Sequence, residues 1–99
     1  MVTLSVTRSR VAKVLRDAAS LLEREGWDPR RYPMVHAIDE VAGFFRPGSN
    51  PTAEETTLRA DDALTELLGL EPVTWEQMSG RTQAEVVTAL RAAADEVVR

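Results

Sequence analysis

The chain has 99 residues, of which 43% are hydrophobic and 28% charged, and its net charge at pH 7 is −4. This composition predicts a single globular domain and excludes a largely disordered chain. The absence of cysteine excludes a disulfide framework, a thiol nucleophile and a cysteine-based metal site. The sequence has neither a basic leader followed by an apolar run nor the roughly 18 apolar residues of a membrane span, so we expect a cytoplasmic protein without a membrane partner.

The charges are unevenly distributed along the chain. Residues 1–31 carry seven Lys or Arg against four acids (+3), whereas residues 32–99 carry five against twelve (−7). We interpret the basic group as a solvated face that neutralises an acidic neighbouring helix. Because the whole domain is acidic and would repel phosphate backbones, we expect no nucleic-acid partner. The basic group consists of Arg8, Arg10, Lys13 and Arg16.

Residues 1–7 are expected to form a short extended arm, and residues 8–99 a single helical domain. Val2, Leu4 and Val6 alternate with polar residues, which is typical of a β-strand. The sequence contains no second strand candidate for it to pair with. The arm therefore has three interpretations: a frayed extended end, an earlier start of the first helix, or a strand that pairs with a second copy.

The spacing of apolar residues predicts four helices separated by Gly and Pro turn signals. The small residues Ala18 and Ala93 in the first and last helices would let these two helices approach closely. Short connections favour antiparallel neighbours, so we expect an all-α fold, a compact four-helix domain. The expected helices cover residues 8–25, 34–45, 52–68 and 83–98.

The helix ends carry capping signals. Thr7 is expected to cap the start of the first helix, and Gly26 its end. The Thr-x-x-Glu spacing at Thr52–Glu55 and at Thr82–Glu85 predicts capping boxes that open the third and fourth helices, because each hydroxyl and each carboxylate can accept from a free backbone N–H.

His36, Asp39 and Glu40 are the catalytic candidates. On a helix, the two carboxylates lie three and four residues beyond the only histidine, so either could hold the imidazole and raise its pKa. General acid–base catalysis needs such a pair in a pocket. The alternative is a solvated ion pair on the polar face of the helix. A single strong ligand type at helical spacing predicts no metal site, and we expect no cofactor.

Trp27 and Trp75 each lie just outside a helix end. Large aromatic residues in such places usually close the open end of a small core, but these two could instead line a pocket. Arg81 precedes the last helix, whose N-terminus would favour an anion, although Thr82 and Glu85 compete for the same N–H groups. The candidate ligand-binding residues are Trp27, Tyr32, Phe44, Trp75 and Arg81.

Leu58 lies nearly opposite the apolar stripe of the third helix. It is either a single exposed apolar residue or part of a surface that docks a partner or a second copy. The acidic third helix and the basic first helix would also allow a complementary contact between two copies. The candidate interaction residues are Leu58, Val2, Leu4 and Val6.

Three motifs stand out along the chain: Gly26-Trp27 after the first helix, Trp75, and Gly80-Arg-Thr-x-x-Glu85. In these motifs the chain resembles a family of small uncharacterised proteins of actinobacteria and their phages. The chain departs from the family's pattern at Glu76-Gln77, where the family has Asn-Asp, and at Val35-His36-Ala37, where it has a stretch containing cysteine and glycine. The resemblance implies a helical fold and an actinobacterial origin, and it implies no activity.

We therefore expect a non-catalytic protein-interaction or regulatory protein that forms a homodimer. The alternative is a small-molecule-binding accessory protein or a small enzyme of specialised metabolism, which would use His36 and a carboxylate in an aromatic-lined pocket. A DNA-binding regulator would need basic residues on a reading helix. The third helix offers only Arg59, so the sequence argues against that class.

Overall fold

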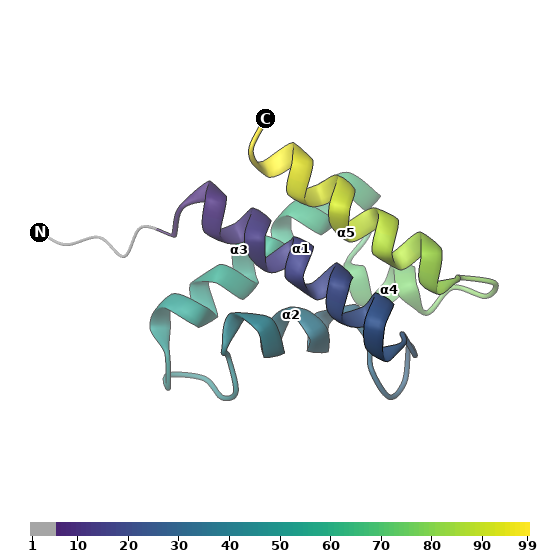
Figure 1. Ribbon diagram of the computed structural model, residues 1–99, viewed down its shortest axis with the longest axis horizontal. Coiled ribbons are helices and arrows are strands. Elements are labelled where there is room, and N and C mark those ends of the chain that lie inside the picture. The colour runs from purple at the N-terminus through teal and green to yellow at the C-terminus, as the bar shows by residue number, and fades with distance from the viewer. Residues whose placement is uncertain (1–5) are drawn as a thin grey trace, which may run out of the picture.

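Five helices form the computed structural model, which describes residues 6–99 (Figure 1). The predicted all-α fold is confirmed, and Val2 and Leu4 of the expected arm lie outside the described residues. None of the helices is long and apolar enough to cross a membrane. The helices are α1 (Arg8–Glu25), α2 (Met34–Ala42), α3 (Pro51–Leu68), α4 (Pro72–Glu76) and α5 (Gln83–Val97).

Local capping explains where α1 and α5 begin. The hydroxyl of Thr7 accepts from the backbone N–H of Arg10 at 3.1 Å, and α1 ends at Gly26, as predicted. At the start of α5, Thr82 and Glu85 form the predicted capping box: the Thr82 hydroxyl accepts from the Glu85 N–H, and the Glu85 carboxylate accepts from the Thr82 N–H.

The start of α3 and the end of α2 differ from the sequence prediction. Asn50 caps α3 and accepts from the N–H of Ala53 at 3.1 Å, so the predicted capping box at Thr52–Glu55 is wrong. Asn is a stronger cap than Thr, and Pro51 at the first helical position already has the φ angle that a helix needs. Helix α2 stops at Ala42 because Gly43 adopts a left-handed conformation with φ of 82°, three residues earlier than expected.

The short helix α4 lies in a stretch that was expected to be a turn. Pro72 occupies its first turn, where a missing N–H does no harm. Its five residues are too few to produce a recognisable apolar repeat. The domain therefore has the four predicted longer helices and one additional single-turn helix, which carries Trp75 and Glu76.

Helices α1 and α5 pack side by side in opposite directions (Figure 1). Two ion pairs join them, Arg16 to Asp95 at 3.1 Å and Arg91 to Glu23 at 2.9 Å. Arg16 thus neutralises a carboxylate of a neighbouring helix, in line with the interpretation of the basic face. Both helices carry buried small residues, which permit a close approach between helices: Ala12, Ala18 and Ala19 on α1, and Ala89, Ala93 and Ala94 on α5.

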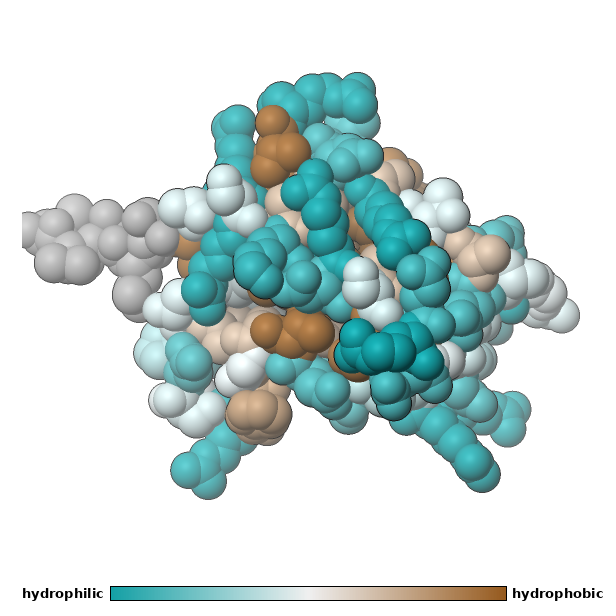
Figure 2. Space-filling view, in the orientation of Figure 1, coloured by the Kyte–Doolittle hydropathy of each residue, from teal (hydrophilic) through white to brown (hydrophobic). Residues whose placement is uncertain are grey.

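The outer surface over α1, α2 and α5 is mostly hydrophilic, with apolar side chains scattered over it, as Figure 2 shows. Val6, the first described residue, is half-buried and packs against the core. This face therefore offers no broad apolar surface for a partner. A more continuous apolar surface lies between α3 and α5.

Candidate functional site

Glu76 is a buried carboxylate that joins three parts of the chain. Its side chain lies at the end of α4, and the residue is only 1% exposed. Oε1 accepts from the indole Nε1–H of Trp27 and from the backbone N–H of Met34, both at 2.9 Å. Pro33, which precedes α2, provides no side-chain cap, so Glu76 caps α2 from a distant position in the sequence.

Two glutamines complete this contact. The backbone N–H of Trp27 donates to Oε1 of Gln83 at 2.8 Å, and Nε2 of Gln77 donates to the carbonyl oxygen of Pro29 at 2.7 Å. The side chains of these two glutamines and of Glu76 therefore hold the loop that connects α1 to α2. We call Glu76, Gln77 and Gln83 the clamp.

The environment of Glu76 favours its neutral form. Burial raises the pKa of the carboxyl group, and the bonds from Trp27 and Met34 oppose this rise. Oε2 is buried without a hydrogen-bond partner among the described residues. A buried carboxylate with one unpaired oxygen is poorly solvated in its charged form. Glu76 therefore holds its proton more tightly than an exposed glutamate would.

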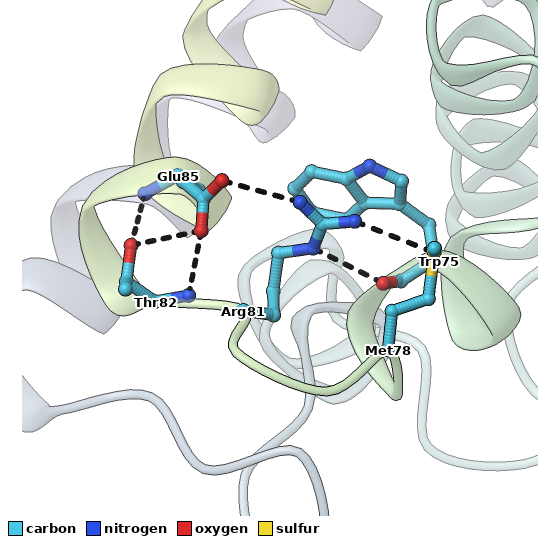
Figure 3. A network of polar contacts seen from close by, with 5 residues as sticks. All are labelled: Trp75, Met78, Arg81, Thr82 and Glu85. Atoms are coloured by element: carbon cyan, nitrogen blue, oxygen red, sulfur yellow. Dashed lines mark hydrogen bonds and ion pairs between the residues drawn. The ribbon is translucent and has the colours of Figure 1, made fainter.

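Trp75, next to Glu76, is covered on one side by Arg81 (Figure 3). The guanidinium carbon lies 3.8 Å from the ring centroid, a cation–π contact. The same guanidinium donates from Nε to the Trp75 carbonyl oxygen and from Nη1 to Glu85, each at 3.2 Å. Arg81 therefore stabilises the turn between α4 and α5, and this arrangement gives no support to the predicted anion site.

Trp75 also lines an apolar hollow between α3 and α5. The hollow has a volume of about 390 Å³ and is shallow and open to solvent. Small residues on α5 leave this space open. Its lining residues are Leu67, Leu68, Trp75, Ala84, Glu85, Thr88, Ala89 and Ala92.

A second hollow, of about 380 Å³, continues the first along the same two helices. Leu67 lines both hollows, and the residues that pair across them show that α3 and α5 run in opposite directions. We call the two hollows together the α3–α5 groove. The second hollow is lined by Ala63, Glu66, Leu67, Glu96 and Val97. Of the candidate site residues predicted from the sequence, only Trp75 lines this groove.

The predicted catalytic group lies at the surface of α2. Nε2 of His36 is 3.8 Å from Oε1 of Glu40, and the His36 side chain is 57% exposed. The ring of Tyr32 contacts the imidazole edge-on at a centroid distance of 4.9 Å. A hollow of about 180 Å³ lies beside His36, Asp39, Glu40, Phe44 and Phe45.

The predicted aromatic residues are thus not brought into one pocket. Tyr32 and Phe44 lie near His36, whereas Trp27 packs on the core beside Glu76 and Trp75 lines the α3–α5 groove. Leu58 is 54% exposed on α3. This exposure is consistent both with a single exposed apolar residue and with a surface that docks a partner or a second copy.

Asp61 on α3 is a largely buried carboxyl group that the negative charge of Asp39 on α2 also influences. The pKa of Asp61 is raised to about 6. Burial is the largest cause, and the charges of Asp39 and Asp62 also contribute. Burial also raises the pKa of Asp39, against the opposing effect of His36. One oxygen of Asp61, Oδ1, is buried without a hydrogen-bond partner among the described residues. The charged form of Asp61 is therefore unfavourable in the folded chain.

Comparison with known proteins places the chain in a family. Residues 6–96 match a family described as a family of unknown function (DUF6197). The chain belongs to this family. No curated protein and no solved structure matches the chain. Within residues 6–99, no group of three or more His, Cys, Asp or Glu side chains could hold a metal ion.

The motifs that carried the family resemblance meet in space. Trp27, which follows Gly26, is bonded through its indole to Glu76 and through its backbone to Gln83. Gly80-Arg-Thr forms the turn that covers Trp75 and opens α5. In this chain the motifs therefore hold the helices together and set one end of the α3–α5 groove.

We predict that Glu76→Ala lowers the free energy of unfolding by about 2–4 kcal/mol, because it leaves two donors unpaired and opens a cavity. Urea unfolding followed by circular dichroism measures the effect. The matched control is Gln77→Ala, an exposed neighbour that makes one bond to Pro29, for which we expect about 1 kcal/mol or less. Equal losses in the two variants would contradict the central role of Glu76.

We predict that Asp61→Asn stabilises the fold at pH 7 and has little effect at pH 4. The folded-state pKa of about 6 lies above the unfolded value of about 3.9, so the wild-type chain loses stability as the pH rises through this interval. After allowance for solvent screening, we expect a gain on the order of 1 kcal/mol at pH 7.

The measurement for Asp61→Asn is urea unfolding at several pH values, with Glu66→Gln, an exposed carboxylate on the same helix, as the control. A difference between variant and wild type that does not change between pH 4 and pH 7 would contradict the raised pKa of Asp61.

Proposed function

We propose that this chain is a non-catalytic protein-interaction protein and that the α3–α5 groove is its docking surface. The observation that carries the proposal is the open apolar hollow of about 390 Å³ between α3 and α5, with the partly exposed Leu67 at its wall. Its lining is almost entirely apolar, with Glu85 as the one charged side chain. Such a surface is typical of sites that bind another protein segment.

The shape of the groove favours a helix as the bound segment. Ala84, Thr88 and Ala92 follow one another at intervals of four residues on the α5 wall. Small side chains at this spacing form a shallow row into which the ridge of another helix can pack. The opposite wall offers Leu67 and Leu68 for apolar contact. We therefore propose helix-in-groove recognition.

Self-association is a second part of the proposal. Leu58 favours it, because it is exposed on α3 outside the groove. The charge asymmetry gives it less support than the sequence alone did, since Arg16 pairs with Asp95 within one chain. A cytoplasmic location and an actinobacterial origin also belong to the proposal, on the grounds of the sequence.

The alternative is a small-molecule-binding accessory protein or a small enzyme built on His36. One observation favours it: Asp39, half-buried beside His36, has a raised pKa, as acid–base groups often do. The adjoining hollow of about 180 Å³ is below the usual size of a ligand-binding pocket, and His36 itself is exposed. We therefore rank this alternative second.

We predict that a neutral amphipathic helical peptide, with a Leu/Ala face and a Gln/Ser face, binds in the groove. NMR titration of the labelled chain should shift the amide signals of Leu67, Trp75 and Ala92. The double variant Leu67→Gln/Ala92→Gln should bind at least about tenfold more weakly, because it makes the groove polar.

The matched control for this titration is Leu58→Gln/Ser20→Gln, which makes similar changes at exposed positions outside the groove. It should bind the peptide like the wild-type chain. Absence of binding to the wild-type chain, or equal weakening in both double variants, would contradict the proposed docking surface.

We predict that the chain is a dimer in sedimentation equilibrium and that Leu58→Gln weakens the dimer about tenfold, because it removes the exposed apolar contact. A copy lacking residues 1–6 tests the contribution of the arm in the same experiment. A monomeric wild-type chain would contradict self-association and leave the groove proposal intact.

A further inference from the structure

We propose that the partner segment in the α3–α5 groove is a basic amphipathic helix. This inference rests on the proposed function and names the chemistry of its partner. The charged side chains that line the two hollows of the groove are Glu66, Glu85 and Glu96, all acidic. No Lys or Arg among the described residues lines either hollow. A docked helix would therefore meet an apolar floor bordered by negative charge.

The acidic residues lie on both walls of the groove. Glu66 is on α3, and Glu85 and Glu96 are on α5, eleven residues apart. At a rise of 1.5 Å per residue, these two lie roughly 16 Å apart along the helix axis. The spacing fits a partner helix of about three turns, with Lys or Arg on both flanks of its apolar face.

The negative charge of the groove is only partly neutralised within the chain. Glu85 pairs with Arg81, and Glu96 with Arg99 at 3.5 Å. Glu66 forms no ion pair among the described residues 6–99, although Arg8 and Arg59 line the adjoining hollow that it also borders. Unpaired carboxylates beside an apolar floor attract a cationic partner and repel an acidic one.

A second copy of this chain fits the groove less well than a basic helix from another protein. Four of the five basic residues of α1 are engaged within the chain: Arg10 with Thr56, Lys13 with Asp17, Arg16 with Asp95 and Arg24 with Glu25. Residues 32–99 carry a net charge of −7 from five basic and twelve acidic residues. Two acidic surfaces facing one another would repel.

The experiment compares three helical peptides of about 18 residues. They share one Leu/Ala face and differ in the other face, which is Lys/Arg, Gln/Ser or Glu. Each is titrated into the full chain at about 0.05 M and about 0.5 M salt, with affinity measured by fluorescence anisotropy. We expect the basic peptide to bind at least about tenfold more tightly than the neutral one at low salt, and this advantage to shrink at high salt.

Two double variants locate the source of this advantage. Glu66→Gln/Glu96→Gln should remove most of it while leaving the affinity for the neutral peptide unchanged. Glu40→Gln/Glu71→Gln changes the net charge equally at exposed positions outside the groove and should retain it. Loss of the advantage in both double variants would mean general charge attraction and would overturn the inference.

The outcomes separate this inference from the proposed function. If the neutral and basic peptides bind equally well, or the acidic peptide binds best, the basic-partner inference is wrong and the groove stays a docking surface. If none of the three peptides binds, the proposed function itself fails. If Leu67→Gln/Ala92→Gln does not weaken the basic peptide, that peptide binds elsewhere, and the inference is overturned.

Discussion

The carboxyl group of Glu76 is the interaction on which the arrangement of the helices depends. Helix α2 begins after Pro33, which has no side-chain oxygen to cap it, and the first N–H groups of a helix need partners. Glu76 accepts from the N–H of Met34 and from the indole of Trp27. One side chain therefore connects the end of α4 to the start of α2 and to Trp27, the second residue after α1. Without it, three segments would lose their common partner.

Long-range contacts of this kind explain which parts of the structure could be predicted from sequence. The ends of α1 and α5 depend on residues that are close in the sequence, such as Thr82 and Glu85. Their capping patterns could therefore be recognised in the sequence. The start of α3 was misplaced because two capping signals overlap, and the Asn50-Pro51 signal prevails over Thr52–Glu55. The clamp could not be predicted, because Glu76 and its partners lie 42 and 49 residues apart. No local pattern records such a pairing.

The candidate site was only partly predictable for a related reason. Sequence reasoning grouped the aromatic residues by chemical type, which suggested one pocket around His36. The structure gives Trp27 and Trp75 separate tasks, because Trp27 bonds to the clamp whereas Trp75 is covered by Arg81 and faces the groove. An apolar groove between two helices depends on their distance and on the side chains that fail to fill it. Ala84 and Ala92 look like ordinary helix formers in the sequence.

The groove is a physical consequence of the way α5 packs. Small side chains on α5 permit close packing against its neighbours, and Ala93 and Ala94 are fully buried. Ala84 and Ala92 lie on the face of α5 that borders the groove, and their side chains are too small to fill the space between α5 and α3. Larger apolar residues at these two positions would fill the groove without disturbing the contact with α1. The many alanines of α5 thus permit close packing in the core but leave space between α5 and α3. The carboxylates of Glu66, Glu85 and Glu96 border that space. The same alanine-rich helix therefore supports the fold on one side and forms a wall of the proposed docking groove on the other.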